Sequence, residues 1–336
     1  MSPKHAFAAL LLTLAMALTA CGGGGGQDAS SDGDASGDGA FPVTIEHKYG
    51  TTEITSEPKK VVTLGLSDQD AVLALGVKPV GAVDWFKEDP YGKWPWTKDR
   101  WGDDKPEIVG ERDEYNMEKV AELEPDVIIA QYSGMQKEQY EKLSKIAPVV
   151  AQPKDYPDYA APWQEMSRRI GKALGKEAEM DQLIKDTDEK FAKVREEHPE
   201  FAEETVIVAD SFEPGVYSAF AKTDPKAIFF KELGFKLSGD VDKLVENNMN
   251  VAEFGSEKLD LLDSADRVVW VTSSEEANDR IKGEKLYQRL NVVKDGDDLF
   301  IPYQDPDIGA AFSFNTVLSI PYAIDETVPL LTADDK

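Results

Sequence analysis

The sequence predicts an α/β fold of two Rossmann-like lobes with mostly parallel sheets, which one long α-helix joins and between which a ligand cleft lies. Short apolar runs alternate with helical patterns in the first half of the chain, and the alternation restarts at Val206. Uninterrupted apolar strands are typical of parallel sheets that helices cover on both faces. A proline-free stretch from Trp163 to His198 lies between the halves and predicts the joining helix.

Residues 1–20 have the pattern of a secretory signal peptide. A short polar head with Lys4 precedes an apolar stretch of about fifteen residues, whereas a spanning helix needs about 20. The stretch ends in Leu-Thr-Ala-Cys, which resembles a bacterial lipobox and implies that Cys21 carries a lipid. Residues 21–40 add a Gly/Asp/Ser tether that we expect to be disordered. The alternative is an ordinary signal peptide, in which the only cysteine of the chain is incidental.

The chain contains 64 acidic and 37 basic residues, which gives a net charge of −27. Nucleic acid and anionic lipid attract basic surfaces, so this composition argues against nucleic-acid binding and against close adsorption to a membrane. Histidine is scarce, and His47 and His198 are predicted to be surface residues. No hydrolase, zinc, calcium or phosphate-loop motif occurs. We therefore expect no catalytic residue, no directly bound metal, and a binding protein rather than an enzyme.

Residues 41–156 are predicted to form the first lobe. An alternating segment at 43–49 turns at Gly50 and returns at 52–56, which indicates a β-hairpin. Apolar strands and helices then follow in alternation. The strands are expected at 61–64, 80–83, 127–130 and 149–150, and the helices at 67–76, 117–123 and 136–146.

Residues 157–200 are predicted to be the backbone helix, in which Gly171 and Gly175 are the weak points. At 1.5 Å per residue such a helix would be about 50 Å long and would restrict the lobes to small relative motions. Residues 201–336 are predicted to form the second lobe. Its strands are expected at 206–209, 268–271 and 299–301, and its helices at 227–233 and 319–331.

The two halves share short patterns at corresponding places, which indicates two similar lobes. The Leu-Gly-x-Lys pattern occurs at 75–78 and 233–236, and Glu-Lys at 118–119 and 257–258 is followed by Asp126 and Asp266, each before a strand. The spacing to the aspartate differs by one residue. Because ligands of open α/β sheets bind at the carboxyl ends of the strands, two facing lobes predict a cleft between them.

Six segments of the chain together resemble a known family; they are 43–47, 50–52, 60–64, 74–81, 123–130 and 318–325. They resemble iron-siderophore ABC transporter substrate-binding lipoproteins, the periplasmic-binding-protein family with a single backbone helix. The resemblance covers the whole chain after the signal and implies a monomer, lipid-anchored on the extracytoplasmic face of the cell membrane. It implies that the protein captures a ferric siderophore and delivers it to an ABC permease and its ATPase. No cofactor is expected, because iron would be bound only through the siderophore.

The resemblance also implies that one glutamate at a helix start in each lobe pairs with arginines of the permease. Glu118 and Glu257, which the internal pattern singles out, occupy these positions. One anionic group on each lobe lets a transporter contact both lobes at once, and carboxylate–arginine pairing is directional. The alternative is that each glutamate only interacts with the dipole of its own helix.

Hydroxamate-siderophore binders of this family carry an arginine in Gly-x-Arg upstream of Asn-x-Glu. Here Gly-Glu-Arg, ending at Arg112, precedes Asn-Met-Glu, ending at Glu118. The resemblance therefore implies that Arg112 donates to the iron-bound oxygens of the ligand. The alternative is a surface ion pair with Asp113 or Glu114. Tyr115 replaces the proline that usually follows in the family, which implies a differently shaped loop.

Rigid aromatic side chains suit a bulky, half-apolar ferric siderophore. Proline keeps Trp94-Pro95-Trp96 extended, which places both indoles on one side; the alternative is that the rings pack on each other. Trp163 and Trp270 are predicted to be core residues. The candidate ligand-binding aromatics are Trp85, Trp94 and Trp96 in one polar loop region, and Tyr132, Phe212, Tyr217 and Tyr303 shortly after strands.

The type of siderophore follows from the charges. No cluster of arginines accompanies Arg112, and a trianionic catecholate siderophore would need several, so a neutral or cationic ferric hydroxamate is favoured. The first alternative is the same fold binding haem or cobalamin, with Tyr132, Tyr217 or Tyr303 as a haem ligand. The second alternative is a lipid-anchored hydrolase with a carboxylate pair, although no pair stands out.

Overall fold

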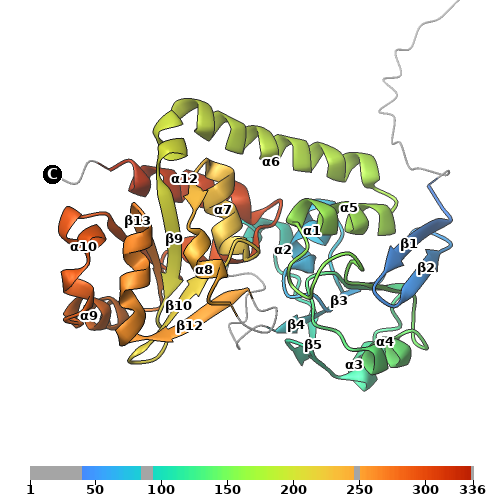
Figure 1. Ribbon diagram of the computed structural model, residues 1–336. Coiled ribbons are helices and arrows are strands. Elements are labelled where there is room, and N and C mark those ends of the chain that lie inside the picture. The colour runs from blue at the N-terminus through green and yellow to red at the C-terminus, as the bar shows by residue number, and fades with distance from the viewer. Residues whose placement is uncertain (1–39, 85–93, 246–249, 334–336) are drawn as a thin grey trace, which may run out of the picture. The chain divides into compact units, whose positions relative to one another are not determined.

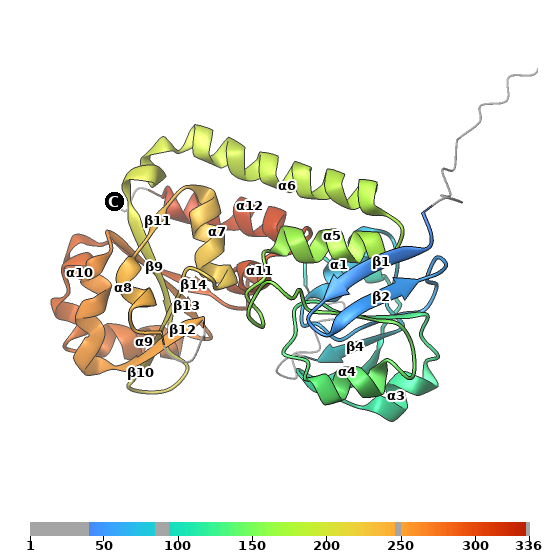
Figure 2. The ribbon, with the colours of Figure 1, turned by 45° about the vertical axis from the view of Figure 1, so that its right-hand side comes forward.

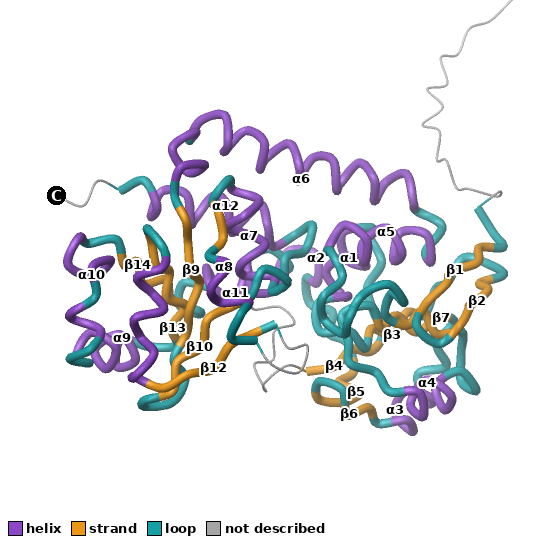
Figure 3. Tube along the Cα trace, viewed as in Figure 1, coloured by secondary structure: helices purple, strands orange, loops and turns teal. Residues whose placement is uncertain are grey.

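The computed structural model describes residues 40–84, 94–245 and 250–333 (Figure 1). The expected α/β fold is confirmed, because two β-sheets are each covered by helices on both faces (Figures 1 and 2). Figure 3 distinguishes the helices, strands and loops of these residues. Within these ranges, no helix combines the length and the apolar character that are needed to cross a bilayer.

The expected β-hairpin consists of β1 (Val43–His47) and β2 (Gly50–Ile54), which pair antiparallel. Gly50 has a φ of +135°, a backbone conformation that residues with side chains rarely adopt, and it allows the tight turn. The prediction that His47 is a surface residue is wrong, because it is only 2% exposed and its Nε2 lies 2.9 Å from Thr52 Oγ1. Burial, together with the charge of Arg169, lowers the pKa of His47 to about 4.

The first sheet has the strand order β6-β5-β4-β3-β7-β8, and all its pairs are parallel except β5–β6. Four of its strands lie in the predicted apolar runs, and the four residues of Val127–Ala130, for example, are completely buried; β5 and β6 were not predicted. The strands are β3 (Val61–Thr63), β4 (Gly81–Asp84), β5 (Glu107–Glu111), β6 (Glu114–Tyr115), β7 (Val127–Ala130) and β8 (Val149–Ala151).

Helices cover both faces of this sheet. The helix α1 (Asp68–Ala74) lies beside α5 (Trp163–Ala173) on one face, and α3 (Met117–Glu122) and α4 (Lys137–Leu143) lie on the other (Figures 1 and 2). The short α2 (Lys98–Trp101) packs against α1.

The second sheet has the order β12-β10-β9-β13-β14, and β11 also pairs with β9. It is parallel through β11, β9, β13 and β14, whereas β10 is antiparallel to both of its neighbours. The strands are β9 (Thr205–Asp210), β10 (Val216–Phe220), β11 (Lys236–Leu237), β12 (Val251–Gly255), β13 (Arg267–Thr272) and β14 (Asp298–Pro302).

The helices of the second lobe again flank the sheet. In Figures 1 and 2, α7, α11 and α12 lie on one side of it and α9 and α10 on the other. The α-helices are α7 (Pro225–Leu233), α8 (Gly239–Asp242), α9 (Glu275–Gly283), α10 (Asn291–Asp295), α11 (Ile308–Phe314) and α12 (Ser319–Leu331), and the 3₁₀ helices are η1 (Pro199–Glu203), η2 (Ser256–Ser264) and η3 (Tyr287–Arg289).

The prediction of one continuous backbone helix is wrong. The connection consists of α5 and α6 (Glu177–Glu197), and the chain turns between them at Gly175, which has a φ of +68°. A Cβ atom on Gly171 would lie 2.6 Å from the Cβ of Met180, so these two residues are in contact. In a continuous helix they would be about 13.5 Å apart at 1.5 Å per residue. The two helices therefore fold back on each other, and only α6 is long.

The internal sequence pattern has a structural counterpart. The Asp126 carboxylate accepts hydrogen bonds from the backbone amides of Lys59 and Lys60 at 2.7 and 2.8 Å, just before β3. In the second lobe, the Asp266 carboxylate accepts from the backbone amide of Thr205 at 2.8 Å, at the start of β9. Each aspartate thus ties the strand that follows it to the start of the neighbouring strand, which supports two lobes of similar construction.

Asp70 of α1 joins the first lobe to the chain that precedes α12. It is 4% exposed, and its Oδ2 accepts hydrogen bonds from Thr316 Oγ1 at 2.8 Å and from Trp96 Nε1 at 2.9 Å. Burial raises the pKa of Asp70 to about 6, and the two hydrogen bonds oppose this shift. Tyr322 of α12 packs against Trp96 with 5.5 Å between the ring centres. Asp70 is therefore the polar centre of a mainly apolar contact between distant parts of the chain.

We expect Asp70→Ala to destabilise the protein by about 2–4 kcal/mol, because two buried donors lose their acceptor. Urea denaturation followed by circular dichroism measures the change in the free energy of unfolding. The control is Asp99→Ala, since Asp99 is exposed in α2, and its effect should stay within about 0.5 kcal/mol. Equal effects of the two substitutions would show that Asp70 does not hold this contact.

Candidate ligand-binding site

Arg112 and Tyr132 lie at the carboxyl ends of two strands of the first sheet. Arg112 follows β5 with a φ of +51°, and its backbone amide donates to the carbonyl of Asp84 at 2.9 Å. Tyr132 follows β7 and is 6% exposed. Burial raises the pKa of Tyr132 well above its usual value; the Asp224 carboxylate adds to this shift and the Arg112 guanidinium opposes it. Asp224 belongs to the second lobe, so charges of both lobes act on this phenol.

The backbone of Tyr132 is fixed by a buried carboxylate. Asp68, at the start of α1, accepts hydrogen bonds from the backbone amides of Gln131 at 2.7 Å and Tyr132 at 3.1 Å. Asp68 is 3% exposed, so water does not compete for these bonds. The backbone that carries the Tyr132 phenol is therefore rigidly held.

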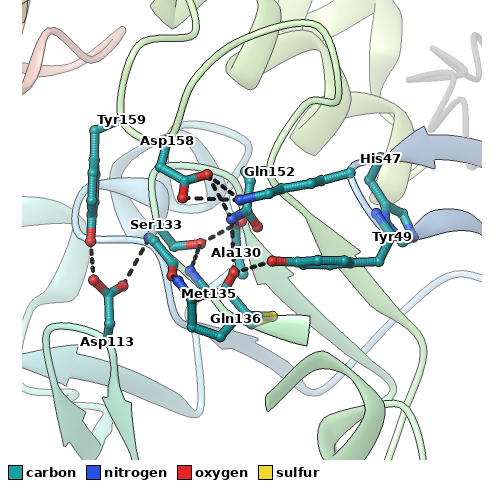
Figure 4. Close-up of polar contacts among 12 residues, drawn as sticks. His47, Tyr49, Asp113, Ala130, Ser133, Met135, Gln136, Gln152, Asp158 and Tyr159 are labelled. Atoms are coloured by element: carbon teal, nitrogen blue, oxygen red, sulfur yellow. Dashed lines mark hydrogen bonds and ion pairs between the residues drawn. The ribbon is translucent and has the colours of Figure 1, made fainter. Parts of the chain in front are cut away.

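Asp113 holds the loop around this phenol (Figure 4). Its carboxylate accepts hydrogen bonds from the Gly134 amide at 2.9 Å, from the Tyr115 hydroxyl at 3.2 Å and from the Tyr159 hydroxyl. The Tyr159 ring meets the Tyr132 ring edge-on, with 5.3 Å between the ring centres. Burial raises the pKa of Tyr159, and the bond to Asp113 raises it further, so the phenol stays protonated.

The loop after β7 is also held from its other side, as Figure 4 shows. The carbonyl of Met135 accepts hydrogen bonds from the Tyr49 hydroxyl and from Gln152 Nε2, the latter at 3.0 Å. Asp158 in turn accepts from Gln152 Nε2 at 3.1 Å and pairs with Lys48 at 2.7 Å. These bonds preorganise the loops that carry Tyr132 and Tyr159, which lowers the cost of ordering them on binding.

The facing part of the second lobe is acidic. Asp210 ends β9 and Asp224 caps α7, and each is 4% exposed. Lys226 Nζ lies 3.5 Å from Asp224 Oδ1, and Asn250 Nδ2 donates to Asp224 Oδ2 at 2.8 Å. Within the described ranges, no three histidine, cysteine or acidic side chains are arranged to hold a metal ion.

Phe212 is the most exposed large apolar residue among those described, at 66%, and it follows β9. Tyr156, in the loop after β8, is 37% exposed. Tyr303 follows β14, is half-buried, and its amide donates to the Thr272 carbonyl at 2.7 Å. Exposed aromatic side chains at strand ends are available to cover an apolar ligand surface.

Trp94 and Trp96 pack within the fold, whereas they were predicted to bind the ligand. The Trp94 and Trp96 rings do lie on one side, stacked with 5.0 Å between their centres. Trp94 is only 6% exposed, however, and Trp96 donates to Asp70, so the pair packs within the fold. Trp85 and Cys21 lie outside the described residues. The predictions that Trp163 and Trp270 are core residues are confirmed, at 4% and 0% exposed.

Tyr217 is likewise a core residue rather than a cleft residue. It is 2% exposed and packs against Phe254 and Trp270, each with 6.1 Å between ring centres. Its strand β10 begins after a short connection from β9, and the strand alternation turns Tyr217 inward. From the sequence, Tyr217 was expected to follow the strand at 206–209 and not to lie within a strand of its own.

Glu118 and Glu257 occupy equivalent places in the two lobes. Glu118 is exposed in the first turn of α3, whose N-cap Asn116 accepts from the Lys119 amide at 3.1 Å. Glu257 is exposed in the first turn of η2, a 3₁₀ helix where an α-helix was expected. Its carboxylate folds back over Gly255, since a Cβ there would lie 2.3 Å from Glu257 Oε2.

Three polar residues, Tyr159, Asp210 and Asp224, were not singled out from the sequence. Tyr159 has no local signal, because only the folded loop brings its hydroxyl to Asp113. Asp224 precedes Pro225, and this pattern indicates a helix cap but gives no signal of a role in a site. Asp210 ends an apolar strand, which was the one available signal of a polar side chain at the cleft edge.

Comparisons with known proteins agree with this architecture. Residues 61–302 match the family model described as periplasmic binding protein. The chain is 28% identical over 297 residues to the probable siderophore-binding lipoprotein YfiY of Bacillus subtilis (strain 168), across 85% of this chain and 87% of that protein. It is 27% identical over 298 residues to the iron(3+)-hydroxamate-binding protein FhuD of the same strain, across 87% of each chain.

A solved structure has the same overall fold. The crystal structure of Streptococcus pneumoniae TIGR4 PiaA in complex with ferrichrome superposes with a TM-score of 0.74 at 29% sequence identity. The match covers 86% of this chain and 97% of that one, so it includes both lobes.

We expect Asp113→Ala to destabilise the protein by about 1–3 kcal/mol and to speed hydrogen exchange at 133–136, because three donors lose their common acceptor. Urea denaturation and hydrogen-exchange mass spectrometry measure these changes. Asp155→Ala, an exposed substitution in the neighbouring loop, serves as the control and should leave both unchanged. Unaltered exchange at 133–136 in Asp113→Ala would mean that the other bonds of the loop suffice.

Proposed function

Because the chain belongs to the periplasmic binding protein family, we propose that it is the extracytoplasmic solute-binding component of an ABC importer, which captures a ferric siderophore and delivers it to the permease. The observation that carries the proposal is the match of both lobes to the structure of PiaA in complex with ferrichrome. At the carboxyl edge of the first sheet, Arg112 follows β5 and Tyr132 follows β7. A ligand at this edge would meet both side chains.

The hydrogen-bond donors suit the oxygens of an iron chelate. Iron-bound oxygens retain partial negative charge, and a guanidinium forms directional, charge-assisted bonds to such acceptors. The Tyr132 hydroxyl is protonated at neutral pH, because its pKa is raised further above its usual value. A protonated phenol donates a hydrogen bond to the same oxygens. Arg112 and Tyr132 thus form the polar wall, and exposed Phe212, Tyr156 and Tyr303 supply apolar cover.

A hydroxamate siderophore fits this wall better than a trianionic catecholate. Among the residues that the structure describes in the first lobe, Arg112 is the cation whose charge lowers the pKa of Tyr132, whereas Asp224 of the second lobe raises it. An environment with few cations disfavours a triply charged anion. The relative named as an iron(3+)-hydroxamate-binding protein supports the same class.

The remaining roles follow from the family and the sequence. Cys21 would carry the lipid that anchors the protein to the outer face of the cell membrane, with residues 21–40 as the tether. Glu118 and Glu257 would meet arginines of the permease, one from each lobe, because both are exposed and equivalently placed. Neither role requires a cofactor or a catalytic residue.

We expect the purified protein to bind a ferric trihydroxamate with nanomolar affinity and Arg112→Ala to weaken binding by about 10- to 100-fold. One charge-assisted hydrogen bond contributes about 1.5–3 kcal/mol, which corresponds to that range. Quenching of tryptophan fluorescence measures the affinity, with Arg289→Ala as an exposed control. Tight binding of haemin or cobalamin instead of the hydroxamate would overturn the ligand class, and full affinity of Arg112→Ala would overturn the site.

We also expect Glu118→Ala and Glu257→Ala each to reduce siderophore uptake by about 10-fold or more while leaving affinity for the siderophore unchanged. Loss of one partner of an interfacial ion pair costs about 2–5 kcal/mol. Uptake of radioactive iron by cells that carry each variant is the measurement. Glu122→Ala, an exposed glutamate at the other end of α3, is the control. Normal uptake in both variants would rule out this docking mode.

A further inference from the structure

A narrow cavity lies between α1, α5 and the segment that connects α11 to α12. The space that the centre of a water molecule can occupy in it is about 10 Å³, which is about what one water molecule requires. Apolar side chains form part of its wall, and polar ones form the rest. The polar lining residues are Ser67, Asp68, Trp163, Ser167, Asn315 and Thr316. A buried cavity with this mixture of walls suits a small polar ligand.

The indole of Trp163 supplies a hydrogen-bond donor to this cavity. Trp163 is the first residue of α5 and is 4% exposed. Its Nε1 is buried, and no group in the described part of the chain accepts a hydrogen bond from it. An indole nitrogen only donates, and a buried tryptophan usually finds an acceptor for it. The donor therefore requires an acceptor from the cavity that Trp163 lines.

The amide of Asn315 supplies the complementary acceptor. Asn315 follows α11, is 4% exposed, and its Nδ2 donates to the Pro225 carbonyl at 2.6 Å. Because a carbonyl oxygen only accepts, this bond fixes the orientation of the amide and leaves Oδ1 as the atom that faces away from Pro225. Oδ1 is buried and receives no hydrogen bond from any described residue. It therefore requires a donor.

One water molecule satisfies both requirements, because water donates and accepts. Within the described ranges, Trp163 Nε1 and Asn315 Oδ1 do not bond each other directly, although both residues line the same small cavity. A buried donor or acceptor without a partner is costly, and such groups in native proteins are commonly paired by ordered water. A buried water usually forms about three hydrogen bonds, and the hydroxyl groups of Ser67 and Ser167 are available for the third.

We propose that this cavity binds one structural water molecule, which accepts a hydrogen bond from Trp163 Nε1 and donates one to Asn315 Oδ1. The site does not depend on the ligand of the proposed function. Trp163 belongs to α5, which packs against α1 of the first lobe, and Asn315 is bonded to α7 of the second lobe. The water therefore forms a second polar link between the lobes, next to the bond between Asp70 and Thr316.

A crystal structure of the purified protein, at a resolution that shows ordered water, tests the site directly. We expect density for one water molecule at about 2.7–3.2 Å from both Trp163 Nε1 and Asn315 Oδ1. A direct bond between the two side chains, a water that contacts only one of them, or a cavity without water density would each overturn the proposal. This experiment needs no variant, so it does not depend on whether a substituted protein folds.

A double-mutant cycle tests the link in solution. Trp163→Phe removes the donor but keeps an aromatic ring, and Asn315→Gly removes the acceptor at a φ of +48°, which glycine adopts readily. If one water joins the two groups, the second substitution should change the unfolding equilibrium constant by a factor about 5-fold smaller than when it is made alone. Urea denaturation followed by circular dichroism gives this constant.

The matched control pairs Trp163→Phe with Thr327→Val. Thr327 Oγ1 is also buried and without a hydrogen-bond partner among the described residues, but Thr327 belongs to α12 and does not line the cavity. The effects of this control pair should multiply independently. Independent effects in the pair of Trp163→Phe and Asn315→Gly as well would show that no water joins these side chains and would overturn the proposal.

Discussion

The carboxylate of Asp68 is the constraint on which the carboxyl edge of the first sheet, at Gln131 and Tyr132, depends. It is buried at the start of α1, yet it accepts the backbone amides of Gln131 and Tyr132, so one helix fixes the end of a neighbouring strand. Burial raises the pKa of Asp68 to about 6, and these backbone bonds oppose the shift. A Cβ on Gly65 would lie 2.1 Å from Asp68 Oδ2, so glycine is required at that position. The direction of the Tyr132 phenol follows from this packing.

The two lobes share a framework but differ in the charges that follow their strands. Asp126 and Asp266 tie equivalent strands in the two lobes, which gives both the same framework. In the first lobe Arg112 follows β5, whereas in the second lobe the buried Asp210 ends β9. A ligand bound between the lobes, as proposed, would therefore meet different charges on its two sides.

The sequence pattern predicted the features that depend on short-range interactions. The apolar strand runs and the motif that ends at Arg112 appear where the sequence placed them, because strand burial and turn chemistry are short-range properties. Gly175 was recognised as a weak point, but whether glycine ends a helix depends on the packing of Gly171 against Met180, which is tertiary. Tyr217 was misplaced although Pro214-Gly215 is a turn signal, because the strand after this turn was not recognised. The contact of Tyr159 with Asp113 could not be predicted, because the two residues lie far apart in the sequence.

Because α5 and α6 fold back on each other, the lobes are connected differently from the prediction. Instead of a single rod, α6 packs against α5 on the first lobe and against α7 and α12 on the second. The buried bond between Asp70 and Thr316 adds a second crossing. A motion that broke this bond would leave buried polar groups unsatisfied, at about 1–3 kcal/mol for each group. Relative motion of the lobes is therefore least costly where it leaves the bond between Asp70 and Thr316 intact.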